Sequence, residues 1–294
     1  MKRILTVLFC AALGLIAAED IADKAIALEK QGKYLEAVKL YEKLTTEEPD
    51  NEYIWIAIGR CYRYQGEHMR SLSMYLKASQ IVTNDASIWL EVGKTYRYLH
   101  DNANAALMYE KAAQCETNND KKKVYLKDAG NIYFEMESFE KAKKAIRAAI
   151  AIDPNYSMAF NNLASIYIVE HNYSNAIRVL EKAFELDPDN TLPLLNLILV
   201  YAYQKNAVKC NEYASKALSM ESPSPQYIHL YLAVLHVQLG DKPSWKAQLE
   251  LAFKKDKLRP FFDEKDDFKN EYGFDPVRND VDFKALVTSY FMKR

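Results

Sequence analysis

Apolar residues in the stretch 157–190 recur at the spacing of an amphipathic helix, in two separate runs. In the first run, Phe160, Leu163, Ala164 and Tyr167 stand at i, i+3, i+4 and i+7, on one face of a helix. The second run has a similar spacing and comprises Tyr173, Ala176, Ile177, Leu180, Ala183 and Phe184. A polar break separates the two runs, and an Asp-Pro step ends the second. The pattern predicts a hairpin of two helices.

The same pattern recurs along most of the chain. Aligning its equivalent positions gives units that start near Ala18, Glu52, Ala86, Lys123, Ser157, Thr191 and Gln226, at steps of 34, 34, 37, 34, 34 and 35 residues. One hairpin cannot bury both of its apolar stripes by itself, so neighbouring hairpins are expected to stack in series. A polar insertion at 119–123 accounts for the long step and predicts either a longer turn or a longer following helix.

Several residue types recur in register within these units. The second unit has Trp55, Gly59, Tyr62, Gly66, Tyr75 and Ala78. The third has Trp89, Gly93, Tyr96, Ala105, Tyr109 and Ala112, and the fourth has Gly130, Tyr133, Phe139, Ala142, Ala149 and Pro154. With its period of 34 residues, this pattern resembles the tetratricopeptide repeat (TPR) family over roughly 18–259. The resemblance implies an all-α, right-handed superhelical solenoid of antiparallel helix pairs, with about six to seven repeats over 19–259.

The first eighteen residues have the composition of a secretory signal peptide. Lys2-Arg3 form a basic start, 4–18 is apolar, and Ala17-Ala18 precede two acidic residues. We therefore expect an exported bacterial protein, periplasmic or secreted, cleaved near Ala18. An uncleaved anchor and a lipid on Cys10 are the alternatives, and both would place the chain at a membrane through its N-terminus.

The last part of the chain, 260–294, departs from the repeat. Its ending resembles a segment that follows the last repeat in bacterial members of the family, where apolar residues cover the open end of the solenoid. Phe274, Val277, Phe283 and Leu286 are the candidates for that capping role. Because the segment mixes acids with aromatics, a second interpretation is that it binds the groove itself.

Composition excludes several classes of function. The formal net charge is −1 with 39 basic and 40 acidic residues, which disfavours nucleic-acid binding. The four cysteines and five histidines have neither zinc-ligand spacing nor an i, i+4 pair, so no metal or other cofactor is expected. Cys61, Cys115 and Cys210 are expected to be buried unpaired thiols, and three histidines (His68, His100 and His171) to lie in inter-helix turns. No catalytic constellation appears, so the chain is expected not to be an enzyme.

The best candidate site is a motif that occurs twice. The segments 59–64 and 93–98 match as G-[RK]-x-Y-R-Y, one period apart. In each segment the basic residues and the last tyrosine stand at i, i+3 and i+4, on one helix face. The candidate binding residues are Arg60, Arg63, Tyr64, Lys94, Arg97 and Tyr98. Four cations and two tyrosines side by side would suit a carboxylate, a phosphate or an acidic peptide.

Asparagines mark a second candidate region. Asn131, Asn161, Asn162 and Asn196 fall at or near the positions that, by resemblance, line the concave groove of the family, with Tyr203 as part of an apolar wall. An asparagine offers both a donor and an acceptor, so a ladder of them can pair with an extended peptide backbone. The sequence thus favours a non-enzymatic scaffold or adaptor of the cell envelope that binds a peptide or protein, acidic or carboxylate-ended. The alternative is a periplasmic transport accessory that holds a small anion at the cationic motif.

Overall fold

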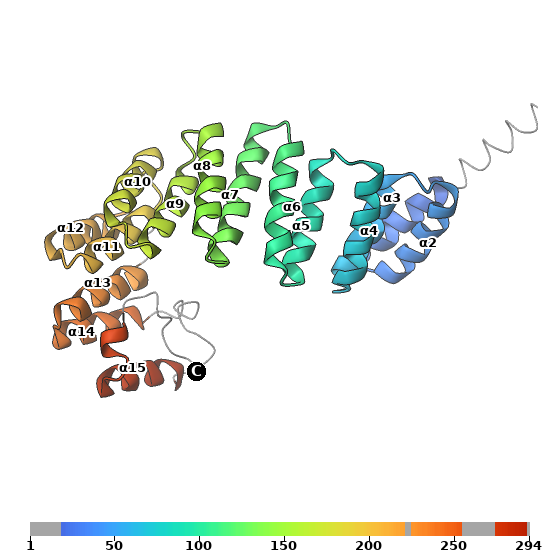
Figure 1. Cartoon of the computed structure of the whole chain (residues 1–294). Coiled ribbons are helices and arrows are strands. Elements are labelled where there is room, and N and C mark those ends of the chain that lie inside the picture. The colour runs from blue at the N-terminus through green and yellow to red at the C-terminus, as the bar shows by residue number, and fades with distance from the viewer. Residues whose placement is uncertain (1–18, 221–224, 255–273, 293–294) are drawn as a thin grey trace, which may run out of the picture. The chain divides into compact units, whose positions relative to one another are not determined.

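A computed structural model describes residues 19–220, 225–254 and 274–292, and every regular element in these ranges is helical (Figure 1). The expected signal peptide, 1–18, lies outside the described residues. The chain divides into two compact units, 1–153 and 154–294. The first unit contains a helix over 19–30 followed by α2 (Tyr34–Glu47), α3 (Glu52–Tyr64), α4 (His68–Ile81), α5 (Ala86–Tyr98), α6 (Asn102–Cys115), α7 (Asn119–Glu135) and α8 (Phe139–Ile152).

The second unit is built in the same way. It contains α9 (Ser157–Val169), α10 (Tyr173–Leu186), α11 (Leu192–Tyr203), α12 (Ala207–Leu218), α13 (Pro225–Leu239), α14 (Lys242–Ala252), the 3₁₀ turn η3 (Asp275–Val277) and α15 (Val281–Met292). Within each unit, consecutive helices pack as antiparallel pairs, and each pair packs on the next, as α4 does on α5 and α10 on α11. The predicted all-α arrangement of stacked helix pairs is confirmed within each unit.

The helix starts follow the sequence period. The helices α3, α5 and α9 begin at Glu52, Ala86 and Ser157, where the second, third and fifth units were expected to begin. The fourth unit differs, because α7 begins at Asn119. The side chain of Asn118 accepts hydrogen bonds from two backbone N–H groups of the first turn, so the polar insertion becomes an extra turn of helix.

Each hairpin turns through a residue in the left-handed region. In the first unit these residues are Gly32, Gly66, His100 and Glu137, and in the second unit they are His171, Lys205 and Gly240, with φ between 56° and 77°. A left-handed residue after a helix lets the last carbonyls accept backbone hydrogen bonds, as from Gly66 N–H to the Arg63 carbonyl at 3.0 Å. The expected turn position holds for His100 and His171 but is wrong for His68, which is the first residue of α4.

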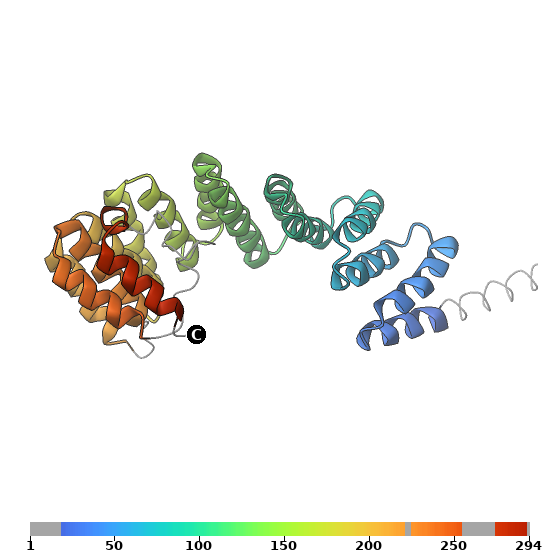
Figure 2. The ribbon, with the colours of Figure 1, turned by 90° about the horizontal axis from the view of Figure 1, so that it is seen from below.

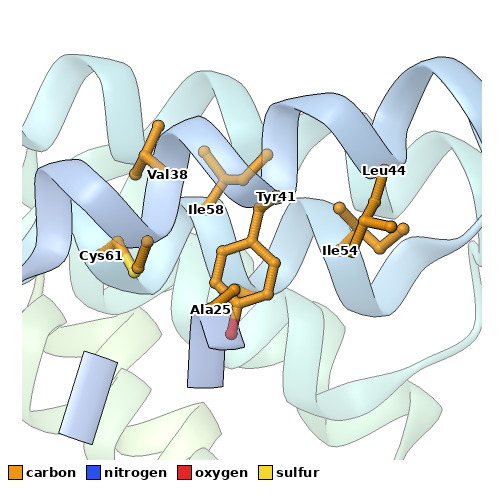
Figure 3. Close-up of a cluster of buried hydrophobic side chains, with 9 residues drawn as sticks. Ala25, Val38, Tyr41, Leu44, Ile54, Ile58 and Cys61 are labelled. Carbon is orange, nitrogen blue, oxygen red and sulfur yellow. The ribbon is translucent and has the colours of Figure 1, made fainter. Parts of the chain in front are cut away.

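Small residues inside the first helices allow the partner helix to approach. A Cβ atom built on Gly59 would lie 2.9 Å from the ring of Tyr75, and one on Gly93 would lie 2.9 Å from the ring of Tyr109. The neighbouring core, drawn in Figure 3, joins the helix 19–30 to α2 and α3. Its buried members include Ala25, Val38, Tyr41, Leu44, Ile54, Ile58 and Cys61. Large side chains thus fill the space that glycine and alanine open.

The C-terminal residues that the structure describes pack on the last hairpin of the second unit. Figure 2 shows α15 beside α14, and η3 contacts α13. The Phe283 ring meets Trp245 edge-on, with centroids 6.2 Å apart, and stacks on Phe274 at 5.6 Å. All three side chains are buried, whereas Val277 and Leu286 are half-buried. Lys242 adds ion pairs to Asp280 at 2.7 Å and Asp282 at 3.0 Å. A capping role for the whole segment stays a prediction, because residues 255–273 lie outside the described part.

Candidate functional site

The four predicted cations of the first unit all pair with carboxylates. Arg60 donates to Glu29 through Nε and, at 2.9 Å, through Nη2. Lys94 lies 2.7 Å from Glu91, and Arg63 Nε lies 3.6 Å from the other oxygen of that carboxylate. These contacts connect the helix 19–30 with α3, and α3 with α5.

Arg97 extends the same arrangement to α7. Its guanidinium donates to both oxygens of Glu135, and Nη1 also donates to Asn102 at 3.3 Å. We call the seven residues Glu29, Arg60, Arg63, Glu91, Lys94, Arg97 and Glu135 the charged row. Four cations against three carboxylates leave the charged row with one net positive charge. The expected cluster of four cations is therefore a mixed row of both signs.

Sequence reasoning missed the three carboxylates, although the period contains a signal for one of them. Glu29 stands exactly one period before Arg63 and two before Arg97, so an acid occupies in the first repeat the position that holds arginine in the next two. For Glu91 and Glu135, the alignment of the repeats gives no signal of this kind. Their partners come from a neighbouring helix, and a period does not say which side chains meet across a helix interface.

Glu29 lies deeper than the cation that it holds, whereas Glu135, at 46% exposed, is more open than Arg97 at 37%. The Glu29 side chain is 13% exposed and that of Arg60 is 40% exposed. The hydrogen bonds with Glu29 and with Glu135 raise the pKa of Arg60 and of Arg97, so both guanidinium groups stay charged at any physiological pH. Among the described residues, Nη1 of Arg60 and Nε of Arg97 make no hydrogen bond. These arginines are held in place and still present N–H donors to a ligand.

The two predicted tyrosines stack on the preceding repeat. Tyr64 stacks on Tyr34 with ring centroids 5.1 Å apart, and Tyr98 stacks on His68 at 4.8 Å. In the first pair, Tyr34 begins α2 and Tyr64 ends α3. In the second pair, His68 begins α4 and Tyr98 ends α5, so the two partners are 30 positions apart in both pairs. Tyr64 and Tyr98 remain 55% and 52% exposed. Next to the first pair, Ile26, Glu29, Lys30, Tyr34, Arg60 and Tyr64 line a shallow hollow of about 270 Å³.

The predicted asparagines are divided between the units. Asn131 lies on α7 of the first unit, while Asn162 on α9 and Asn196 on α11 belong to the second. Asn196 donates to the side-chain oxygen of Asn161 at 2.9 Å, so two of these asparagines meet between neighbouring repeats. Tyr203 stacks on Tyr173 at 5.9 Å, again 30 positions apart. The second unit therefore repeats the aromatic contact but has an amide pair in place of the ion pairs.

Cysteine and histidine side chains build no further site in the described residues. Cys61 and Cys210 are buried free thiols, as expected, and Cys115 is half-buried. Burial raises the pKa of Cys210 to about 12 and that of Cys61 to about 11, which makes both thiols poor nucleophiles. In the ranges that the structure describes, no three His, Cys, Asp or Glu side chains gather to hold a metal ion. No described helix is long and apolar enough to cross a bilayer.

These features define a helical-repeat protein whose candidate site runs along the first helices of successive hairpins. Sequence profiles described as tetratricopeptide repeat match residues 22–86, 128–156 and 159–190. Tetratricopeptide repeats therefore make up these three ranges of the chain. No curated protein sequence matches it significantly. The family supports a protein–protein interaction scaffold, and no enzyme family matches.

Solved structures share the fold at low sequence identity. YrrB, a TPR protein with an unusual peptide-binding site, is 21% identical with a TM-score of 0.51, over 64% of this chain and 96% of that one. The C-terminal part of a TPR protein from Cytophaga hutchinsonii is 18% identical with a TM-score of 0.62, over 80% and 95%. A TPR protein from Parabacteroides merdae is 16% identical with a TM-score of 0.59, over 93% and 98%.

Proposed function

We propose that this protein is a scaffold that binds an extended segment of a partner protein across α3 and α5 of the first unit. The observation that carries the proposal is the charged row, in which carboxylates hold the half-exposed side chains of Arg60 and Arg97 while each keeps an N–H group without a hydrogen bond to the described part of the chain. Fixed donors bind acceptor groups with little loss of side-chain entropy. The peptide-binding site in the name of YrrB, a structural neighbour, is consistent with such a role.

The chemistry of the row favours a ligand rich in hydrogen-bond acceptors. Main-chain carbonyls, an acidic side chain or a terminal carboxylate would each meet Arg60, Lys94 or Arg97. A small free anion is the weaker candidate, because the carboxylates of Glu29, Glu91 and Glu135 lie among the cations and repel it. In the second unit, the Asn161–Asn196 pair and Tyr203 offer a separate candidate contact of that unit's own.

A crosslinking pull-down with matched charge variants tests the proposal. Arg60→Gln/Arg97→Gln removes two cations of the charged row. Lys77→Gln/Lys111→Gln is the control, since it removes two cations that lie against Trp55 and Trp89 instead. We expect partners captured by the wild type to be lost with the first variant and kept with the control, both folded by circular dichroism. Equal capture by both variants would show that the charged row is not the binding surface.

The basic and apolar residues 1–18 support a second part of the proposal, that the scaffold acts outside the cytoplasm, in the cell envelope. Expression of the full chain in a bacterial host, followed by fractionation and N-terminal sequencing, tests it. We expect an exported chain that begins near Glu19. A cytoplasmic chain with Met1 or Lys2 at its N-terminus would show that the segment is not a signal peptide.

A further inference from the structure

An aromatic edge runs beside the charged row in the first unit. It consists of the two stacked pairs Tyr34–Tyr64 and His68–Tyr98, and we call these four residues the aromatic edge. Leu35 and Met69 follow the stacking residues Tyr34 and His68 in sequence and are 60% and 68% exposed. The two stacked pairs are one repeat apart and similar in geometry, with interplanar angles of 18° and 6°. Large exposed apolar residues that repeat in register indicate an interaction surface.

The groups next to the aromatic edge are mainly hydrogen-bond donors. Arg60 and Tyr64, like Lys94 and Tyr98, are four positions apart on one helix face. The carboxylates of the charged row accept from the cations, and Glu29 and Glu91 are only 13% and 23% exposed, so Glu135, at 46%, is the main acceptor of the row that a ligand can reach. A ligand that suits this surface has acceptors to offer, few N–H groups to satisfy, and rings or aliphatic groups to place on tyrosine.

A proline-rich segment has these properties. Proline has no backbone N–H, and in the polyproline II helix the carbonyls point outward without internal partners. The pyrrolidine ring packs on aromatic side chains, and the helix is already rigid before it binds. Three residues of polyproline II advance about 9 Å, so prolines recur along one side of the helix at a regular spacing. A segment with several prolines would thus offer one ring to each of the two stacked pairs.

We propose that the partner segment is a neutral proline-rich stretch in the polyproline II conformation, with its prolines on the aromatic edge and its carbonyls on Arg60, Lys94 and Arg97. The inference rests on the proposed scaffold function and specifies its ligand. Arg63 lies over the Tyr64 ring at 4.9 Å from the centroid, so Tyr64 is partly covered. Tyr98 has no such neighbour among the described residues, and it is the main proline contact.

Fluorescence anisotropy with the full chain tests the proposal through three labelled probes of equal length, acetylated and amidated at their ends. One repeats Ala-Pro-Pro, one repeats Gly-Ser, and one repeats Asp-Ala-Ala. We expect the proline probe to bind at least about tenfold more tightly than either of the others, because it loses less conformational entropy and adds ring contacts. This comparison uses the wild-type chain and decides the proposal even if a variant does not fold.

Two variants locate the contact. Tyr64→Ala/Tyr98→Ala removes the exposed ring of each pair and should raise the Kd of the proline probe about tenfold. Tyr53→Ala is the matched control, since Tyr53 lies on α3, is 70% exposed and belongs to neither pair. It should leave that Kd unchanged.

Three results would overturn the inference. They are equal affinity for the proline and Gly-Ser probes, tighter binding of the acidic probe, and an unchanged Kd in a folded Tyr64→Ala/Tyr98→Ala variant. Tight binding of the acidic probe that is lost in Arg60→Gln/Arg97→Gln would leave the scaffold function intact and reject only the proline-rich ligand. Partner capture that does not depend on the charged row would instead reject the proposed function.

Discussion

At the residue scale, the hairpin turns show how a repeat tolerates unfavourable residues. The same turn position is left-handed in every described hairpin, yet it is glycine only at Gly32, Gly66 and Gly240. At the other four positions an L-residue with a Cβ atom adopts φ near 57°, at a cost of about 1 kcal/mol or more. The packing of the two helices on either side must supply that free energy.

Lys205→Gly should therefore stabilise the chain. The substitution removes the strain at φ 57° and keeps the hydrogen bond from residue 205 N–H to the Ala202 carbonyl at 3.0 Å. Part of the gain is offset because glycine has more freedom in the unfolded chain, so we expect an increase of about 0.5–1 kcal/mol in the free energy of unfolding. Urea denaturation measures it.

The reverse change provides the control. Gly66→Ala adds a Cβ atom in open space at φ 77°, so only backbone strain should act. It should lower the free energy of unfolding by about 1 kcal/mol. If both substitutions leave the urea midpoint unchanged, these turns do not hold the left-handed conformation in solution.

The sequence predicted which residues share a helix face but not what they touch. Spacing placed Arg60, Arg63 and Tyr64 on one face of α3, where the structure has them. Their partners Glu29, Glu91 and Tyr34 belong to other helices, and the choice depends on helix packing and side-chain rotamers. For the same reason, the period makes Asn162 the equivalent of Asn196 but does not show that the amide of Asn196 contacts Asn161.

At the element scale, the sequence period predicts most helix starts correctly. Where it does not, as at α7, a polar capping residue sets the start of the helix. The extra turn of α7 follows from the cap at Asn118 and was one of two outcomes left open by the sequence. The second-unit helices α11 and α13 are apolar almost all round, so a face cannot be assigned to them from sequence alone. Their burial between neighbouring helices explains that composition.

The contact between α15 and α14 leads to a prediction about the C-terminal segment. Phe283→Ala removes a ring that is 1% exposed and touches Trp245 and Phe274, so the free energy of unfolding should fall by about 3 kcal/mol. Val281→Ala is the control, because Val281 lies on the same helix and is 80% exposed. Urea denaturation and the fluorescence of Trp245, in a Trp55→Phe/Trp89→Phe background, measure the effect.

The same variant separates the two roles considered for this segment. If the segment covers the end of the solenoid, Phe283→Ala should lower stability and leave capture of a partner by the first unit unchanged. Increased capture, with little loss of stability, would show instead that the segment competes for the groove.

At the scale of the whole molecule, each unit buries groups that must stay protonated. Burial raises the pKa of Cys61 in the first unit to about 11 and that of Cys210 in the second unit to about 12. Burial, with Glu91 nearby, raises the pKa of Tyr75 to about 12. In the unfolded chain the thiols would titrate near pH 8.5 and the phenol near pH 10. The folded state therefore binds more protons than the unfolded state throughout the alkaline range.

Stability should consequently fall as the pH rises from about 9 to 12. The slope of the unfolding free energy against pH is proportional to the number of protons bound by the unfolded state minus the number bound by the folded state. Because the folded state binds more protons here, the slope is negative. The stabilisation is complete below the unfolded pKa values and is lost as the pH passes through the folded ones. With these values, the loss by pH 12 is roughly 2 kcal/mol for Tyr75, roughly 3 kcal/mol for Cys61 and roughly 4 kcal/mol for Cys210.

Urea denaturation at several pH values, with cysteine variants, assigns this loss. Cys61→Ala/Cys210→Ala removes both buried thiols and should flatten the decline between pH 9 and about 11, where the phenol contributes least. Cys115→Ala is the matched control, because Cys115 is half-buried, and it should leave the wild-type slope unchanged. A double variant that declines as steeply as the wild type would show that the buried thiols do not set the alkaline limit. The limit would then belong to tyrosines such as Tyr75, whose pKa is also raised by burial.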